Sequence, residues 1–352
     1  MKGEIKLVLI GNNTGYVAAR AKSRRSSLLD RTRLRQLIQQ SPEQLPVSIG
    51  DNGYRAEIDL YAGRYSGADL VEAALTHNLQ SELASILKLC SGSVRELVEV
   101  YTGRFRYHNA KVVLRAVVND VEIDKVRHSI LPEESEINAP WLKMIEESST
   151  IRDAAEQMRR LPFGKDLLIL SSDAKLVDYE NALDRHYFKN SLRVLSGGSP
   201  EVRMLRESIQ MEIDHRNITN ILEGQAFGLS SGEISDALVP GGRIVSERTF
   251  AQATSGRSGL MDLLRQSNRF DSDTFSQVLQ ESDDSRTLDP VITWLRIREH
   301  DMMKRMSYLH PISALPVIHY VASKIEEVDD LRLIVRGRMA GLPTEVIEAH
   351  VL

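Results

Sequence analysis

The sequence has little cysteine and few aromatic residues. Cys90 is the only cysteine among 352 residues, and aromatic residues make up 5%. A single cysteine excludes a disulfide within the chain and a metal site built from several thiolates. Cys90 follows an apolar stretch with helical spacing, so we expect it to be packed in a core. This cysteine usage suits a reducing cytoplasm.

Long apolar runs and an excess of one charge are also missing. The apolar segment Lys6–Ile10 is too short for a signal core and reads as a short strand or as the opening of a helix. No apolar run approaches the ~18 residues needed to span a bilayer. The net charge of −4 gives no basic footprint for nucleic acid. We therefore expect no nucleic-acid partner, and contact with a membrane only through another protein.

Motifs for catalysis are scarce. The segment 11–15 lacks the length and the Gly-Lys-Ser/Thr ending of a phosphate loop, and the nine histidines show no His-Glu-x-x-His spacing. No acid/base pair or activated nucleophile is recognisable. The sequence predicts a protein that is not an enzyme, with no catalytic residue, no cofactor and no metal. An enzyme with a site between domains is an alternative that no motif supports.

What the sequence does contain is a motif that occurs three times. The segment Asn109-Ala-Lys-Val-Val-Leu-Arg115 recurs as Asn217-Ile-Thr-Asn-Ile-Leu-Glu223 and as Asp330-Leu-Arg-Leu-Ile-Val-Arg336. The steps are 108 residues (217 − 109) and 113 residues (330 − 217). Such steps exceed the roughly 20–50 residues of solenoid units and indicate repeats of domain size.

Other motifs recur in the same order around this one. A five-residue motif precedes it at 71–75, 179–183 and, more faintly, 291–295. Further upstream lie Leu34, Leu37 and Ser41; then Leu142, Ile145 and Ser149; then Leu260, Leu263 and Ser267. Downstream, Val126, Ile234 and Ile347 correspond. We predict an N-terminal extension (1–24) and three helical repeat domains (25–132, 133–240 and 241–352), the third with an insertion near 241–259.

Hydrophobic periodicity predicts helices almost throughout. Apolar residues mark one helix over 96–107, with a capping box from Ser93 to Glu96. Ser199 before Pro200, and Ser230 with Glu233, predict two more helix starts. The fold class is therefore all-α, with three similar helical domains around a central pseudo-threefold axis.

Charged residues near the repeated motif are candidates for contacts. Asp214 precedes Asn217 by three residues and Glu327 precedes Asp330 likewise, whereas the first copy has Arg106 there. A spacing of three puts both side chains on one helix face, as a partner contact or as the carboxylate that a helix N-terminus favours. The basic segment 22–35 is either a solvated helix face or a contact with acidic loops or lipid headgroups.

Three segments carry a resemblance to a known family. Residues 327–342 resemble an acid-x-x-Asn-Leu-Arg-x-Ile-x-Arg-Gly-Lys-x-x-Gly-Leu pattern, and residues 16–20 and 214–217, the latter followed by 238–242, match as well. The pattern is that of the C subunit of the archaeal and bacterial A/V-type rotary ATPases, which is related to the d subunit of the eukaryotic vacuolar ATPase. Asp330 stands for the usual Asn, and Arg338 for the usual Lys.

The resemblance implies a non-catalytic central-stalk protein shaped as a funnel. It would sit on the cytoplasmic side of the membrane proteolipid ring as a peripheral protein, receive the D and F subunits of the axle, and support ATP-linked proton or sodium transport. The partner-interface candidates are Arg332, Arg336, Arg338, Asp214 and Glu327. The three arginines could equally pair with acids such as Glu326. A stand-alone helical adaptor with a different client is the alternative function.

Overall fold

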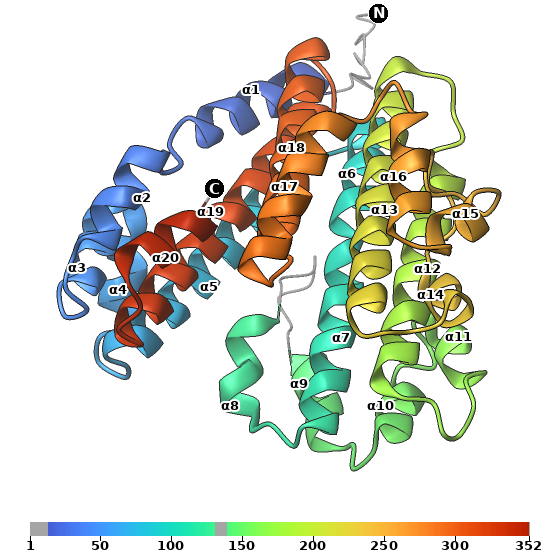
Figure 1. Ribbon diagram of the computed structural model, residues 1–352. Coiled ribbons are helices and arrows are strands. Elements are labelled where there is room, and N and C mark those ends of the chain that lie inside the picture. Colours follow the sequence, from blue (N-terminus) through green and yellow to red (C-terminus); the bar gives the residue numbers. More distant parts are fainter. Residues whose placement is uncertain (1–12, 131–138, 352) are drawn as a thin grey trace, which may run out of the picture.

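The computed structural model describes residues 13–130 and 139–351, and all regular elements in these two ranges are helices. The all-α fold class is therefore confirmed (Figure 1). The apolar segment Lys6–Ile10 lies outside the described residues. The first helices are α1 (Thr14–Arg25), α2 (Arg31–Ile38), α3 (Leu45–Ile49), α4 (Arg55–Tyr61) and α5 (Gly67–Leu87), with an irregular turn at Gly50–Tyr54 between α3 and α4.

Fifteen more α-helices follow in the described ranges. The next are α6 (Gly92–Thr102), α7 (Arg104–Val118), α8 (Ile123–Val126), α9 (Ala139–Glu146), α10 (Ile151–Gln157), α11 (Gly164–Leu168) and α12 (Leu176–Val194), with a short turn at Arg127–Ser129 after α8. The last are α13 (Pro200–Ala226), α14 (Ser231–Ala237), α15 (Phe250–Thr254), α16 (Arg257–Arg265), α17 (Ser272–Ser285), α18 (Asp289–Leu309), α19 (Leu315–Met339) and α20 (Thr344–His350).

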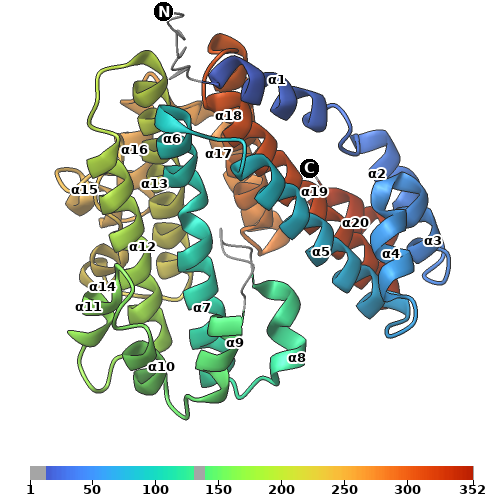
Figure 2. The ribbon, with the colours of Figure 1, turned by 180° about the vertical axis from the view of Figure 1, so that it is seen from behind.

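Long helices pack in three pairs: α7 with α12, α13 with α18, and α19 with α5. The motif at 109–115 lies in α7, and its copies lie in α13 and α19. The preceding motif lies in α5, α12 and α18. Helix α19, near the end of the chain, also contacts α1 and α2 near its beginning. Figures 1 and 2 show the result: α1–α5 lie beside α19 and α20, opposite α10–α16.

The three motif-bearing helices end in the same geometry. Asp120, Gly228 and Gly341 follow their C-termini with positive φ of 49°, 71° and 72°. The capping hydrogen bonds run from Val121 N to Ala116 O, from Leu229 N to Gly224 O and from Leu342 N to Gly337 O, each 2.9 Å. This is the six-to-one bond of a Schellman cap. The steps of 108 (228 − 120) and 113 (341 − 228) equal those of the sequence, so the internal repeat is confirmed.

Small residues let short helices approach these three C-termini. A Cβ atom built on Gly224 would lie 2.6 Å from Ile234 Cγ1 of α14, and one on Gly337 would lie 2.9 Å from Ile347 Cδ1 of α20. The matching residue of α7 is Ala116, which is buried. Close packing of this kind leaves no room for an added methyl group without movement of the neighbour.

The hydrophobic interior forms two clusters in the described residues. One runs from Val17 to Val351 and joins α1–α12 to α19 and α20. The other lies between Ile218 and Leu295 and gives the second half of α13 and α14–α18 a core of their own. Phe270, Phe275 and Trp294 pack edge-on or tilted in this second cluster, with ring centroids 5.2 to 5.5 Å apart.

Several local predictions are confirmed and one is wrong. Ser199 caps α13 by accepting a hydrogen bond from Val202 N, and Ser230 forms the predicted capping box with Glu233. Cys90 is buried. The predicted single helix over 96–107 is broken at Gly103, and α6 begins at Gly92, so Ser93 does not cap it. The positive φ of Gly92 (54°) explains why the chain enters α6 there.

The predicted domain boundaries and the funnel stay predictions. The boundary after residue 132 falls in 131–138, outside the described residues. The expected insertion at 241–259 contains α15, which packs between α14 and α16. No helix in the described part of the chain is long and apolar enough to cross a bilayer.

Candidate functional site

Two of the candidate arginines lie on one face of α19 and meet the same carboxylate. Arg336 Nε is 2.6 Å from Glu72 Oε1, and Arg332 Nε is 3.1 Å from Glu72 Oε2. Arg332 also donates to Thr76 Oγ1 at 3.0 Å. Glu72 is 6% exposed and Arg332 is largely buried, whereas the Arg336 side chain is exposed, so only the Glu72–Arg332 contact is shielded from water. These arginines therefore pair with α5 through Glu72, and Arg332 Nη1 also lies 3.6 Å from Asp329 Oδ1 of its own helix.

The third arginine joins α19 to the chain after α2. Arg338 Nε donates to the backbone oxygen of Gln40 at 3.2 Å. Gln40 lies two residues beyond the end of α2. Because a backbone oxygen carries no charge, this contact fixes the position of Arg338 and leaves its charge uncompensated by that bond.

Glu327 belongs to a buried polar cluster between α19 and the turn before α4. The Tyr54 hydroxyl donates to Glu327 Oε1 at 2.5 Å, and Lys324 Nζ donates to the Tyr54 oxygen at 2.9 Å. Lys324 Nζ lies 3.5 Å from Glu327 Oε1. Burial raises the pKa of Tyr54 well above its usual range, and the negative charge of the neighbouring Glu327 adds to this effect. The phenol therefore stays protonated and acts as a donor.

Asp214 of α13 holds the loop after α14. Its carboxylate accepts hydrogen bonds from the backbone amides of Arg243, Ile244 and Val245 at 3.1, 3.0 and 2.9 Å. Burial raises the pKa of Asp214, and the three amide hydrogen bonds act against that shift. A Cβ atom on Gly242 would lie 2.4 Å from Asp214 Oδ1, which explains a glycine at that place.

Asn217, three residues further along α13, binds the same loop. Its side-chain amide donates to the oxygens of Val239 and Val245 at 2.8 and 3.1 Å, and its oxygen accepts from Val239 N at 2.8 Å. The i, i+3 spacing places both polar side chains on the loop-facing side of α13. The corresponding residues of the other repeats, Asn109 and Asp330, are buried as well.

An ion pair occurs twice at matching positions of the repeat. Arg115 Nε of α7 lies 2.5 Å from Glu180 Oε1 of α12, as Arg336 of α19 meets Glu72 of α5. Each arginine is the last residue of its seven-residue motif, and each glutamate is the second of its five-residue motif. The sequence therefore carried a signal for the partner of Arg336, but only when the copies are aligned with each other.

Polar bridges also join the long helices one after another. Arg104 Nη2 lies 3.1 Å from Glu212 Oε2, which links α7 to α13. His215 Nδ1 lies 2.8 Å from Glu299 Oε1, which links α13 to α18. A pair of side chains from α18 and α19 follows: His300 Nδ1 and Glu326 Oε2, 2.9 Å apart. The last bridge joins Arg25 of α1 to His319 of α19. Sequence patterns gave no sign of these bridges.

The histidines in these bridges differ in protonation. The hydrogen bond with Glu326 raises the pKa of His300 above its ordinary value. Burial lowers the pKa of His319 to about 3, and the positive charges of Arg25, His300 and Lys304 act in the same direction. The two rings lie 5.9 Å apart. The bridge to Glu326 therefore favours the protonated form of His300, while His319 stays neutral at neutral pH.

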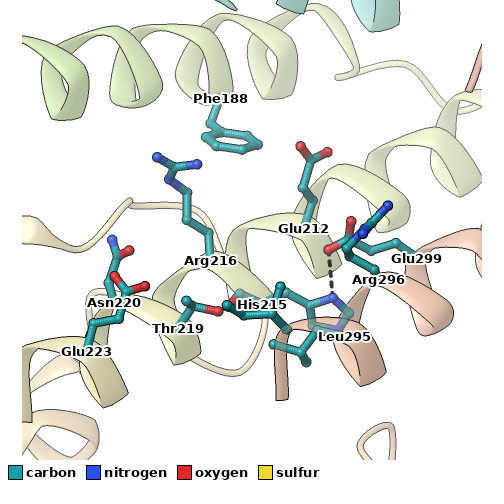
Figure 3. Close-up of a pocket in the computed structure, with 11 residues that line it drawn as sticks. Phe188, Glu212, His215, Arg216, Thr219, Asn220, Glu223, Leu295, Arg296 and Glu299 are labelled. Atoms are coloured by element: carbon teal, nitrogen blue, oxygen red, sulfur yellow. Dashed lines mark hydrogen bonds and ion pairs between the residues drawn. The ribbon is translucent and has the colours of Figure 1, made fainter. Parts of the chain in front are cut away.

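A polar pocket of about 370 Å³ opens beside this chain of bridges, between α12, α13 and α18. Figure 3 shows Glu212, His215 and Arg216 of α13, with Phe188 of α12 on the opposite wall. Carboxylates and guanidiniums alternate in its lining, and no group of three metal-ligating side chains occurs in the described ranges. The pocket therefore offers a polar wall of charged and amide side chains.

Comparison with known proteins matches the chain over nearly its whole length. The sequence model of the family described as ATP synthase (C/AC39) subunit matches residues 17–350. The chain is 30% identical to the C subunit of the A-type ATP synthase from Haloquadratum walsbyi, with 96% of this chain and 98% of that protein covered. It is 28% identical to the protein of the same name from Haloferax volcanii, with 97% and 98% covered. The protein of this name from Methanosarcina mazei is 22% identical, with 96% and 92% covered.

Proposed function

Since the chain belongs to the ATP synthase (C/AC39) subunit family, we propose that it is the non-catalytic central-stalk protein that joins the axle to the proteolipid ring of an A-type ATP synthase. The axle would consist of the D and F subunits. Rotation transmitted through the chain would link ATP synthesis or hydrolysis to proton or sodium transport. The protein would be peripheral, on the cytoplasmic face of the membrane, and attached only through the ring.

The observation that carries the proposal is the full-length family match, from residue 17 to residue 350. The helix packing fits a part that transmits torque. Helix α19 contacts α5, α1, α2 and α18, so a helix near the end of the chain packs against helices near its beginning. Where α19 meets α5, Arg336 adds a charge-assisted hydrogen bond to Glu72, and Arg332 adds an ion pair with the same carboxylate. A closed set of packed helices deforms less under load than an open row.

The contact region is proposed to lie around the ends of the motif-bearing helices. Among Arg332, Arg336, Arg338, Asp214 and Glu327, Arg336 has the most accessible side chain, at 63%. We propose that Arg336 reaches a partner directly, and that the other four shape the surface by fixing α19 and the loop after α14. The three repeat domains would form the walls of a funnel that receives the axle.

Binding tests this proposal directly. The purified full chain should bind ATPase-stripped membranes that contain the ring, in the absence of ATP, and should capture a purified D–F pair. Membranes that lack the ring serve as the control. A chain that stays soluble and monodisperse beside both partners would refute the proposal.

A stand-alone helical adaptor with another client is the second candidate. It shares the fold but needs neither ring nor axle, because one fold serves many functions. Deleting residues 327–352 would not distinguish the adaptor from the coupling protein cleanly, since the deletion removes half of α19 and its contacts with α5. Leaving out the whole chain from an otherwise complete ATPase is cleaner, because an adaptor would leave ion transport unchanged.

A further inference from the structure

A second, larger pocket, here called the groove, lies on the other side of α13. It measures about 580 Å³ and is bordered by α13, α18, the loop after α14 and the turn between α16 and α17. Three methionines, Met204, Met211 and Met302, line it together with Phe270 and Ile244. Methionine side chains adapt to differently shaped partners, which makes them common in protein-binding grooves.

Arginines surround this apolar lining. Arg298 and Arg305 come from α18, Arg243 from the loop after α14, and Arg269 from the turn after α16. The carboxylates in the lining are Glu207 and Asp214, and the three loop amides already enclose Asp214. The arginines therefore outnumber the carboxylates by two (4 − 2).

The pairing of these arginines leaves positive charge unbalanced. Glu207 Oε1 is shared by Arg243 at 3.0 Å and Arg269 at 3.7 Å. Arg305 is exposed and has no ion pair in the described part of the chain. Arg298 lies over the rings of Trp294 and Phe270, 4.7 and 5.2 Å from their centroids. Burial lowers the pKa of Arg298, although Asp271 and Asp301 act against that shift.

The shape favours an elongated occupant. Met204, Met211 and Asp214 line the groove from one stripe of α13, and ten residues of helix (214 − 204) extend about 15 Å. Arg298, Met302 and Arg305 form a second stripe on α18, which packs against α13. Guanidiniums spaced along one helix and two loops suit several carboxylates in a row better than one compact anion. Each Arg–carboxylate contact in such a groove is a strong, charge-assisted bond.

We propose that this groove binds an acidic amphipathic segment of a partner protein. An apolar side chain of that segment would pack on the three methionines, and flanking Asp or Glu side chains would pair with Arg243, Arg269 and Arg305. This is the helix-in-groove mode of recognition, with charge selecting the partner. The crosslinking test below rests on the proposed function, since it seeks the partner in the assembled ATPase, whereas the peptide measurement on the free chain needs neither the axle nor the ring.

Photo-crosslinking in the assembled ATPase tests the groove. Met302 of the full chain is replaced by p-benzoylphenylalanine, with exposed Met339 as the matched control position. We expect Met302 to yield an adduct with a segment of another chain that carries several carboxylates, and Met339 to yield none with that segment. The double substitution Arg269→Glu and Arg305→Glu should lower the yield at least about tenfold, whereas Arg265→Glu, outside the groove, should not.

A peptide measurement keeps the test decisive if the complex does not assemble. The probe is a labelled helical peptide of about 15 residues with leucine at i and i+4 and glutamate on both flanks, compared with its glutamine counterpart. The glutamate peptide should bind the free chain at least about tenfold more tightly, and the double reversal should abolish the difference. Equal affinity for both peptides, or adducts confined to this chain, would overturn the proposal. Binding of pyrophosphate that the double reversal abolishes, without an acidic adduct, would replace the partner segment by a small anion.

Discussion

Arg336 of α19 and Glu72 of α5 form an ion pair across 264 residues of sequence, with 2.6 Å between Nε and Oε1. Arg332, one helical turn earlier, approaches the other oxygen of the same carboxylate. The pair connects a helix near the end of the chain to one near its beginning. In the corresponding ion pair, Arg115–Glu180, the two residues are 65 positions apart in the sequence. The closure between α19 and α5 is thus built like the pairing of α7 and α12.

The first prediction concerns the ion pairs that Glu72 of α5 forms with Arg332 and Arg336 of α19. Glu72→Gln should lower the free energy of unfolding by about 2 kcal/mol, because it removes the nearer of two carboxylates, Glu72 at 3.1 Å and Asp329 at 3.6 Å, from the largely buried Arg332. Arg336→Gln should cost less than about 1 kcal/mol, because its side chain is well exposed. Urea denaturation of the two variants measures both. Equal costs would show that the carboxylate is not the centre of the closure.

The second prediction concerns the loop bound by Asp214. Gly242→Ala should lower the free energy of unfolding by about 2 kcal/mol, since its Cβ atom would lie 2.4 Å from Asp214 Oδ1 and 2.6 Å from Val245 O. Gly198→Ala is the control, because a Cβ atom there meets nothing within 4 Å, and its effect should stay within about 0.5 kcal/mol. Thermal unfolding followed by circular dichroism compares them. A neutral Gly242→Ala would contradict the close approach of loop and carboxylate.

The third prediction follows from the repeated helix ends. Alanine in place of a helical glycine normally gains about 1 kcal/mol, but Gly224→Ala and Gly337→Ala should both destabilise the protein. The reason is the contact of each new methyl group with Ile234 or Ile347. In a double-mutant cycle, Gly224→Ala with Ile234→Ala should show a favourable coupling of about 1 kcal/mol. Additive effects would mean that the helices separate freely there.

The fourth prediction is a pH dependence centred on His300. Its pKa is raised in the folded protein, chiefly by the hydrogen bond with Glu326. A raised histidine pKa contributes stability that is complete below the unfolded value and is lost as the pH rises through the folded value. The wild type should therefore exceed His300→Gln in melting temperature at pH 6, and the gap should shrink toward pH 9. A gap independent of pH would contradict a protonated His300–Glu326 bridge.

Much of the fold was predictable because each repeat shows helical spacing of apolar residues and helix-capping motifs. Leucines and isoleucines at helical spacing gave the helices, and Ser199 and Ser230 gave two of their starts. The break at Gly103 was missed because apolar residues continue across it with helical spacing. Local periodicity reports which residues face a core, and it does not report where the series of helical hydrogen bonds is interrupted.

The candidate residues were predictable as polar positions, but their contacts were not. The acid and Asn at 214 and 217 share a helix face by spacing alone, whereas the loop they bind lies more than twenty residues further along. Glu72 could be found only by aligning the copies and noting Glu180 at the matching place. The groove with three methionines and four arginines joins α13, α18 and two loops, and no pattern within one of these segments indicates it.

Coupled transport in proteoliposomes tests the proposed function most directly. The A-type ATPase is reconstituted with and without this chain, and ATP hydrolysis and ion uptake are recorded together. We predict that the complex lacking the chain hydrolyses ATP without ion uptake, and that adding the purified chain restores the number of ions moved per ATP. An unchanged ratio of ions to ATP in the absence of the chain would contradict its role as the link between axle and ring.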